Sequence, residues 1–253
     1  MPEGPSIVIL RELITPFEGQ KVVSATGNAK IEMDRISGKV LEFCLSWGKH
    51  TLLCFDDFYL RIHFLMFGTY RINERKEQIP RLQLKFKKDE INFYTCSVRL
   101  IDGTPLANYD WASDVMSDYW DPKAALEKLQ ALPPKTLIAD ALLNQEIFSG
   151  VGNIIKNEIL WRFRVHPESY TGSIPLQSQK NLVKDARDYS FLFYEWKKDY
   201  VLKKNWKIYK KSVCPRCNVK TVRAYIGRTP RLTTYCPSCQ LLYNQPKSVR
   251  HVK

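Results

Sequence analysis

Residues 214–239 read CPRCNVKTVRAYIGRTPRLTTYCPSC, and this stretch contains two C-x2-C pairs separated by 18 residues. The pairs are Cys214 with Cys217 and Cys236 with Cys239. Two such pairs on a β-hairpin can aim four thiolates at one point, which is the ligand set of a structural zinc ion. Two disulfides or a redox pair are the alternatives, but the odd total of 7 cysteines and the lack of a secretion signal favour a reducing compartment. We predict one structural Zn²⁺, which folds the segment and leaves no coordination position open for chemistry.

The residues between the two cysteine pairs predict the hairpin itself. Side chains alternate in character over 221–225 and 233–235, which is typical of two short strands. Gly227-Arg-Thr-Pro230 forms the expected turn, and Arg231 follows it directly. A zinc-anchored hairpin with Arg228 and Arg231 near its tip is suited to reach into a nucleic-acid groove and contact phosphate.

The distribution of charge points to the same kind of partner. The chain has 39 Lys and Arg against 26 Asp and Glu, a net charge of +13. From Val201 to Lys253 there are 13 basic residues and no acidic ones, so the first 200 residues hold 26 of each sign. A solvated basic tail would explain the charge alone. Because the segment also holds the cysteine pairs, we expect a polyanion to bind it.

Composition and hydropathy exclude several protein classes. With 253 residues and 44% hydrophobic side chains, the chain can bury real cores, which excludes a disordered chain, and 11 glycines exclude a collagen-like one. No apolar run approaches the roughly 18–20 residues that cross a bilayer, and no signal-peptide core stands near the N-terminus. We expect a monomeric, cytoplasmic protein without a membrane partner, associated with the nucleoid in a bacterial cell.

The first part of the chain predicts a β-rich domain with one flanking helix. Ile7, Leu10 and Leu13 recur at helical spacing within a helix predicted at about 6–15. The predicted strands are short and rich in β-branched or aromatic residues; they lie at 39–46, 51–55, 59–63, 81–87 and 90–94. Repeated strands with short turns are typical of a β-sandwich or barrel-like domain.

The second part changes to helical periodicity. Asp121-Pro122 is a helix start, with Asp as N-cap and Pro at the first helical position, and residues 110–119 before it are polar and aperiodic, as in an interdomain link. Further helices are predicted at 135–145, 154–163 and 175–200. We expect an α+β multidomain chain, with an N-terminal β-sandwich domain at 1–115, a linker and first helix at 116–130, a helical domain at 131–205, a zinc finger at 206–243 and a basic tail at 244–253.

Gly150 and Gly152 join two predicted helices and allow a tight turn between them. They leave Asn153 and the backbone N–H groups after it at a helix N-terminus, where free donors and the helix dipole favour an anion. A purely structural turn explains the same glycines, so this motif gains weight only from its neighbours.

Three motifs occur together in this order: Met1-Pro-Glu-Gly-Pro5, Gly150-Val-Gly-Asn153 and the four cysteines. Together they resemble the formamidopyrimidine-DNA glycosylase/endonuclease VIII family of base-excision repair enzymes, from residue 1 to about 242. The first motif is more similar to the endonuclease VIII branch. The resemblance implies that the helical domain is a helix-two-turn-helix domain. It also implies a bifunctional DNA glycosylase/AP lyase acting on double-stranded DNA with oxidised bases, pyrimidines favoured, or abasic sites.

The resemblance further implies that Pro2 and Glu3 carry the chemistry. Removal of Met1 would expose the secondary amine of Pro2, and an α-amino group with a pKa of about 7.7–8.0 is partly neutral near pH 7. The amine would attack the sugar C1′ atom, expel the damaged base and form a Schiff base, after which β- and then δ-elimination break the strand. Glu3 would be the general acid/base beside it.

Phosphate-binding roles follow from the same resemblance. Lys49, within Trp47-Gly-Lys49, matches the family's essential lysine, and Asn153 and Arg231 match its phosphate-binding asparagine and arginine. Taken one by one, these residues equally fit a surface lysine, a helix cap and a solvated turn residue. The segment HFLMFG at 63–68 matches the family's intercalating loop. Its residues Leu65, Met66 and Phe67 are therefore candidates to fill the gap left by an extruded base, with a core strand as the alternative.

The sequence departs from the family's pattern in two places. Ser6 stands where the family commonly has a second glutamate, which puts in doubt one hydrogen-bond network near the nucleophile. Residues 97–100 have no counterpart to the Arg-Arg-Phe-Gly loop of the formamidopyrimidine branch, which again favours oxidised pyrimidines. Glu158 keeps the acidic position of the second motif helix.

Two other classes of function are open. A catalytically silent protein of the same fold would bind DNA lesions without cleaving the strand, and an RNA-directed zinc-ribbon protein would use only the cysteine pairs. Pro2, Glu3 and Lys49 argue against the first, because a pure binding protein has no use for an N-terminal secondary amine. The second would leave the β-rich first half without a role.

Overall fold

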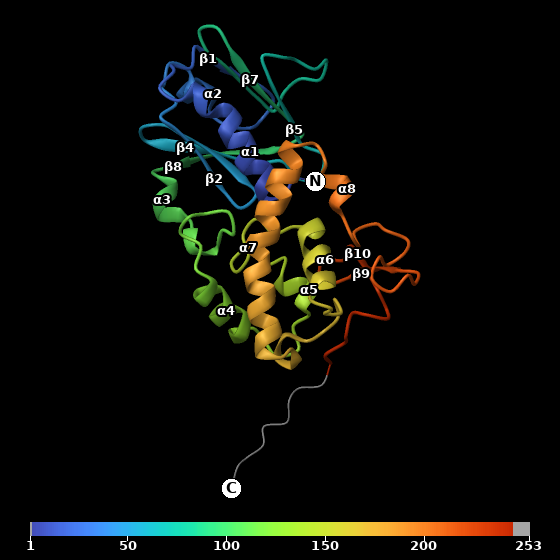
Figure 1. The fold of residues 1–253 in the computed structure, drawn as a ribbon. Coiled ribbons are helices and arrows are strands. Elements are labelled where there is room, and N and C mark those ends of the chain that lie inside the picture. Colours follow the sequence, from blue (N-terminus) through green and yellow to red (C-terminus); the bar gives the residue numbers. More distant parts are fainter. Residues whose placement is uncertain (1, 245–253) are drawn as a thin grey trace. The chain divides into compact units, whose positions relative to one another are not determined.

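The computed structural model describes residues 2–244, and the chain divides into two compact units (Figure 1). The first unit ends at Asp110 and the second begins at Trp111. Residues 245–253, which make up most of the predicted basic tail at 244–253, lie outside the described residues. No helix within residues 2–244 is both long and apolar enough to cross a membrane.

The first unit is the predicted β-sandwich, with two four-stranded antiparallel sheets. One sheet has the order β2-β3-β4-β8, with β2 (Phe43–Trp47), β3 (His50–Cys54), β4 (Phe58–His63) and β8 (Ser97–Asp102). The other has the order β1-β6-β7-β5, with β1 (Ser24–Thr26), β6 (Leu82–Lys85), β7 (Glu90–Tyr94) and β5 (Thr69–Ile72). Buried side chains of both sheets, such as Leu60 and Phe93, share one apolar core.

Helix α1 (Gly4–Ile14) flanks this sandwich and packs against β2 and β3. It begins slightly before the predicted start at Ser6, because Pro5 fits the first turn, where its missing N–H is not needed. Ile7 and Leu10 are buried as the spacing predicts, but Leu13 is 48% exposed, and Ile14 enters the core instead. Three short helices complete the unit: η1 (Thr15–Phe17), α2 (Met33–Ile36) and α3 (Pro105–Asn108).

The strand predicted at 39–46 has different bounds in the structure. Strand β2 begins only at Phe43, because the backbone of Leu41 bonds to the loop after α1 rather than to a sheet neighbour. The Leu41 N–H donates to Gln20 O, and Leu41 O accepts from Gly19 N. A pattern of apolar residues cannot separate these two kinds of pairing.

The second unit is helical and has its own apolar core, to which Val115, Leu129, Ile155 and Tyr189 contribute. Its helices are η2 (Trp111–Ser113), α4 (Pro122–Ala131), α5 (Ile138–Ala141), α6 (Asn153–Arg162), η3 (Thr171–Ser173), α7 (Leu176–Lys198) and α8 (Leu202–Asn205). The predicted cap of α4 is confirmed, because Asp121 Oδ1 accepts hydrogen bonds from the backbone N–H groups of residues 123 and 124.

The predicted link at 110–119 is wrong for most of its length. Val115 is fully buried in the second core, and its N–H donates to Ser149 O. Helix α4 packs against α7, and its Ala125 and Leu129 are buried, so residues 116–130 are part of the helical unit rather than a free connection. The aperiodic sequence hides this because irregular backbone can also be tightly packed.

The helix predicted at 135–145 is also wrong, because only Ile138–Ala141 forms α5 and turns follow it. The polar side chains after α5 bond to nearby backbone and thereby compete with a longer helix. Asn144 Oδ1 accepts from Glu146 N, and Gln145 Oε1 accepts from Gly150 N. The Phe148 N–H returns to Asn144 O and closes the turn that leads into Gly150-Val-Gly-Asn153.

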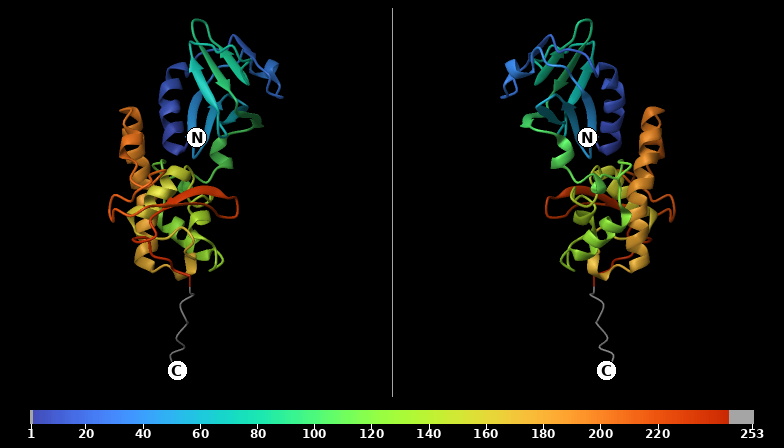
Figure 2. Two further views of the ribbon diagram at one scale, coloured as in Figure 1. Left: turned by 90° about the vertical axis from the view of Figure 1, so that its right-hand side faces the viewer. Right: turned by 90° about the vertical axis from the view of Figure 1, so that its left-hand side faces the viewer.

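The predicted hairpin is present at the end of the second unit (Figure 2). Strands β9 (Val222–Ile226) and β10 (Arg231–Tyr235) pair antiparallel, with Ile226 opposite Arg231, so the turn spans 227–230 as predicted. Gly227 has φ +105°, a backbone conformation that glycine adopts without strain.

Candidate functional site

Pro2 and Glu3 lie at the start of α1, where Glu3 is the N-cap residue. The Glu3 backbone oxygen accepts from Ser6 N at 2.8 Å, which opens the first turn of the helix. The Glu3 side chain is fully buried, whereas Pro2 is partly exposed. A buried carboxyl group beside an accessible residue 2 is an arrangement that can move protons at that residue without competition from bulk water.

Lys49 occupies the two-residue turn between β2 and β3 and is partly buried. The preceding Gly48 has φ +52°, and the flanking residues Trp47 and His50 face each other across the turn with their rings 5.7 Å apart. Trp47 also packs against Tyr109 at 4.9 Å. The lysine therefore projects from a turn whose base is held by stacked rings.

A pair of histidines lies under this turn, and the sequence patterns did not single it out. His50 on β3 is opposite His63 on β4, and their rings are 5.4 Å apart. Burial lowers the pKa of His50 to about 3, and the charges of His63, Arg61 and Lys49 act in the same direction. Burial likewise lowers the pKa of His63, helped by Lys49 and Arg61. Both rings are therefore neutral near pH 7.

The predicted wedge residues form an exposed turn between β4 and β5. Leu65 is 50% exposed, Met66 51% and Phe67 77%, so the alternative that they are core strand is wrong. The turn is closed by a hydrogen bond from Gly68 N to Phe64 O, and a Cβ atom at Gly68 would lie 2.2 Å from that oxygen. Three large apolar side chains in solvent on a fixed turn are available to a binding partner.

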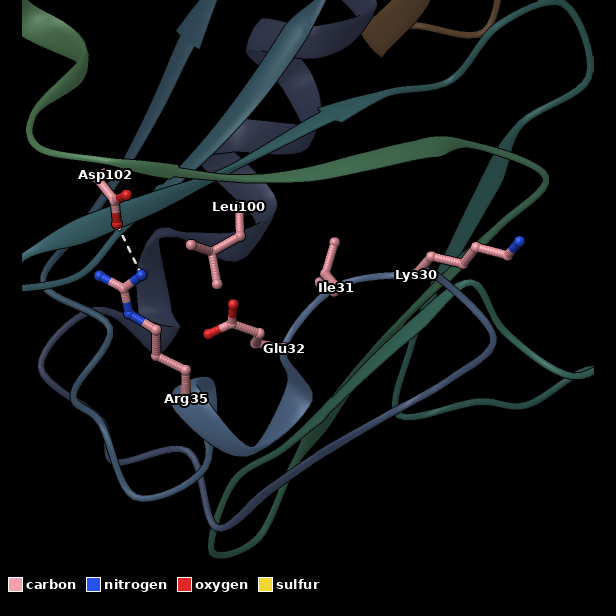
Figure 3. A pocket seen from close by; sticks show the side chains of 6 residues that line it. All are labelled: Lys30, Ile31, Glu32, Arg35, Leu100 and Asp102. Atoms are coloured by element: carbon pink, nitrogen blue, oxygen red, sulfur yellow. Dashed lines mark ion pairs between the residues drawn. The ribbon is translucent and has the colours of Figure 1, made fainter.

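A cavity of about 460 Å³ in the first unit holds none of the predicted site residues (Figure 3). Its polar wall includes Arg35, which pairs with Asp102 at 2.7 Å and with Asp57 at 2.9 Å. The guanidinium group also lies over the Phe58 ring. These internal contacts use the charge of Arg35 within the fold, and the candidate functional residues lie elsewhere.

In the second unit the four predicted cysteines converge, with their Sγ atoms within 4.8 Å of one another. Sγ–Sγ distances are 3.9 Å for Cys214–Cys217 and Cys214–Cys239, and 3.7 Å for Cys217–Cys236. A tetrahedral zinc ion with Zn–S bonds of ~2.3 Å places its ligands ~3.8 Å apart, so the cluster fits such an ion. The four cysteines can therefore hold a metal ion.

Two side chains donate hydrogen bonds to the sulfur atoms. Trp161 Nε1 donates to Cys214 Sγ at 3.3 Å, and Arg216 Nη1 donates to Cys239 Sγ at 3.4 Å. The Arg216 guanidinium also lies over the Trp161 ring at 4.2 Å and donates to the Trp161 backbone oxygen. Such donors stabilise thiolates and orient them as ligands.

Helix α6 binds the hairpin through a buried polar face. Asn153 Nδ2 donates to Leu232 O at 2.9 Å, and Lys156 Nζ donates to the Thr233 hydroxyl at 2.8 Å. Asn157 Oδ1 accepts from Thr234 N at 2.6 Å. Asn153, Lys156 and Asn157 are each less than a tenth exposed. The sequence signal for this face is weak, since apart from Asn153 it is only the polar run 156–158 between Ile155 and Ile159.

Glu158 extends this face to the segment before the first cysteine pair. Its carboxylate accepts from the backbone N–H groups of Lys207, Ile208 and Tyr209. Burial raises the pKa of Glu158, and the three donors partly oppose that shift. The acidic residue noted in the sequence thus anchors the chain that leads into the metal cluster.

Asn153 lies close to Arg231 in the structure, because it bonds to the residue next to Arg231. Gly152, not Asn153, is the N-cap residue of α6, so the helix-cap alternative for Asn153 is wrong. The Asn153 side chain donates a hydrogen bond to the backbone oxygen of Leu232. Arg231 precedes Leu232 and is the first residue of β10. Arg228 is exposed in the turn, and its backbone N–H donates to Asp140.

Comparison with known proteins places these features in a family. A family model described as the formamidopyrimidine-DNA glycosylase H2TH domain matches residues 112–189, which include Gly150-Val-Gly-Asn153. Endonuclease 8-like 3 of Xenopus laevis is 30% identical over 94% of this chain and 40% of that protein. This chain belongs to the formamidopyrimidine-DNA glycosylase/endonuclease VIII family. Endonuclease 8-like 2 of Bos taurus is 27% identical, and the match covers 99% of this chain and 99% of that protein.

The relatives differ from this chain in length. Endonuclease 8-like 3 of Mus musculus is 33% identical over 76% of this chain, but the match covers 33% of that protein. The chain thus spans between a third and two fifths of the endonuclease 8-like 3 proteins of mouse and frog.

Solved structures share the fold. A viral DNA glycosylase matches with a TM-score of 0.83 at 22% identity, covering 94% of this chain and all of that one. The formamidopyrimidine-DNA glycosylase of Lactococcus lactis, solved with DNA containing an AP site, matches with a TM-score of 0.82 at 23% identity, covering 94% and 99%. At this identity the likeness establishes the fold.

Proposed function

We propose that this protein is a bifunctional DNA glycosylase/AP lyase of base-excision repair. The observation that carries the proposal is the fully buried carboxyl group of Glu3 directly after Pro2. Burial of a carboxyl group costs free energy, and a proton-transfer role at Pro2 accounts for a carboxyl group at this buried helix start. The names of the relatives, endonuclease 8-like proteins, support the same activity.

In the proposed reaction Pro2 is the nucleophile. With Met1 removed, its secondary amine attacks the sugar C1′ atom, the N-glycosidic bond breaks, and its electron pair leaves with the base, which takes up a proton. The amine then loses its proton and the C1′–O4′ bond breaks, with O4′ taking up a proton from Glu3, so that nitrogen holds C1′ as an iminium ion. This electron sink makes the C2′ proton acidic. Loss of that proton breaks the 3′ C–O bond, and a second elimination breaks the 5′ bond. Glu3 donates and accepts the protons of these steps.

The proposed substrate is double-stranded DNA with oxidised bases, pyrimidines favoured, or abasic sites. Lys49, Arg228 and Arg231 supply cations for backbone phosphate, and the N-terminus of α6 supplies N–H groups at Asn153. The exposed apolar turn at 65–67 is suited to fill the space of an extruded base. The metal ion at the four cysteines is proposed to be one Zn²⁺, which folds the hairpin and supplies no chemistry.

Borohydride trapping on duplex DNA with an abasic site tests the proposal. Reduction of the iminium should join protein and DNA covalently. Pro2→Leu should lose trapping at least about a hundredfold, because the large side chain keeps Met1 in place and removes the secondary amine, while DNA affinity is largely kept. Pro16→Ala, which changes an exposed proline after α1, is the matched control and should trap normally.

A catalytically silent binder of the same fold gives a different result. It would bind the duplex but give no covalent product with the unaltered chain. Full trapping by Pro2→Leu would contradict the assigned nucleophile instead.

A further inference from the structure

The turn of the hairpin is fastened by an acidic residue from far away in the sequence. Asp140 lies in α5, and both its carboxylate oxygens accept from Arg228 N, at 2.9 and 3.1 Å. A Cβ atom at Gly227 would lie 2.3 Å from Asp140 Oδ1. The carboxylate therefore sits directly against the backbone of the turn, in space that only a glycine leaves open.

A second contact holds the other side of the same segment. Asn153 Nδ2 donates to Leu232 O, so residues 228 and 232 are each tied to the helical part of the unit. Arg231 lies between these two points, at the first position of β10. Its backbone can shift little while both contacts are made.

Electrostatics alone argues against a carboxylate at this place. A negative charge beside cations that bind phosphate weakens binding to DNA, since it repels the same polyanion. A carboxylate with no positional role would therefore only lower the affinity for DNA.

We propose that Asp140 is a positioning residue, which fixes the turn 227–230 so that Arg228 and Arg231 are presented to the phosphates of DNA. This inference rests on the proposed function for its ligand. It assigns to Asp140 no contact with DNA and no part in the chemistry.

The sign of the mutational effect separates a positioning role from a bystander charge. Affinity is measured by fluorescence anisotropy at fixed salt, with a labelled duplex that carries a non-cleavable tetrahydrofuran abasic analogue. Asp140→Ala should bind about tenfold more weakly, because the turn loses an acceptor that a charged group supplied. Asp140→Asn keeps one acceptor oxygen and loses the charge, so it should stay within about threefold of the unaltered chain.

Two further variants sharpen the test. Asp188→Ala removes an exposed carboxylate that pairs with Lys184 on α7, and it should leave affinity unchanged or slightly raised. Gly227→Ala should weaken binding like Asp140→Ala, because its Cβ collides with the carboxylate. The two losses should not add in the double variant, since both act on the same turn.

A readout without DNA keeps this inference distinct from the proposed function. Hydrogen exchange of the Arg228 amide should be slow in the unaltered chain and in Asp140→Asn, and fast in Asp140→Ala, with unchanged zinc content. If the unaltered chain neither binds nor traps DNA, the proposed function fails, while slow exchange still supports the role of Asp140 in fixing the turn 227–230.

Three results would overturn the inference. The first is that Asp140→Ala binds as well as or better than the unaltered chain. The second is that it binds more weakly while the Arg228 amide stays protected. The third is that Asp140→Asn loses as much affinity as Asp140→Ala.

Discussion

Lys49 in the first unit and Arg231 in the second are both predicted phosphate contacts, yet the protein holds them by different means. Lys49 projects from a tight turn of a sheet that covers a large apolar core. Arg231 belongs to a small segment whose own buried apolar cluster contains only Ile208, Cys214 and Cys236 among the described residues. Hydrophobic burial stabilises the first, whereas the second depends on metal ligands and on buried hydrogen bonds.

The comparison shows why the second unit carries so many buried polar side chains. A two-stranded hairpin is at best marginally stable by itself. Polar contacts from α6 fix its register, because Asn153 and Asn157 each bond to one particular backbone group of β10. Such contacts give a single orientation, which a featureless apolar surface would not.

Loss of the metal should produce the largest effect, because it should unfold the hairpin of the second unit and leave the first unit folded. Cys236→Ser should release zinc and unfold the hairpin, since a four-cysteine ion contributes on the order of 10 kcal/mol to such a segment. Proteolysis should then cut within 206–243 and spare the β-sandwich. Metal analysis and limited proteolysis measure both outcomes.

Cys96→Ala is the matched control for this experiment. Cys96 is buried in the first core and lies outside the cluster, so this variant should keep its full zinc content. Full zinc content in Cys236→Ser would contradict the ligand set.

Acid should destabilise the first unit, because His50 takes up a proton more readily in the unfolded chain than in the folded one. The folded pKa of about 3 lies below the ordinary value of 6.5, so protons bind to the unfolded chain first as the pH falls. This contribution to stability is complete above pH 6.5 and decreases by about 1.4 kcal/mol per pH unit down to about pH 3, or about 3 kcal/mol by pH 4.5. His50→Phe, which keeps an aromatic ring but does not titrate, should remove most of that slope.

Hydrogen exchange of β3, corrected for the intrinsic rate at each pH, measures the effect of His50. His166→Phe changes a histidine of the second unit and should leave the exchange of β3 as it is. An identical acid response in His50→Phe and the unaltered chain would show that another group governs the first unit.

Asn157→Ala tests the contact between α6 and β10 in the second unit, although it also removes the hydrogen bond from Asn157 Nδ2 to Asn153 O, and it should have the smallest effect. It leaves the buried Thr234 N–H without its acceptor, at a cost of about 2 kcal/mol. Denaturant unfolding of the hairpin should report this loss. Asn181→Ala is the control: it changes a partly exposed asparagine of α7 whose Oδ1 accepts from Gln177, and it should be neutral within about 0.5 kcal/mol.

Short-range patterns predicted a large part of this molecule. The cysteine spacing, the turn at 227–230 and the cap at Asp121 depend on residues close in sequence, and each is present in the structure. The helix at 135–145 failed because Asn144 and Gln145 favour turns, which compete with the helix through contacts that apolar periodicity does not register.

The sequence by itself determined which residue types were available: a proline and a glutamate near the start, two cysteine pairs, and arginines at a hairpin tip. Only the tertiary structure decided that Glu3 is buried, that Glu158 binds the backbone at 207–209, and that Asp140 holds Arg228. The physical reason is separation along the chain. Asp140 and Arg228 are 88 residues apart, and no local periodicity encodes a contact that exists only after both helices and hairpin have packed.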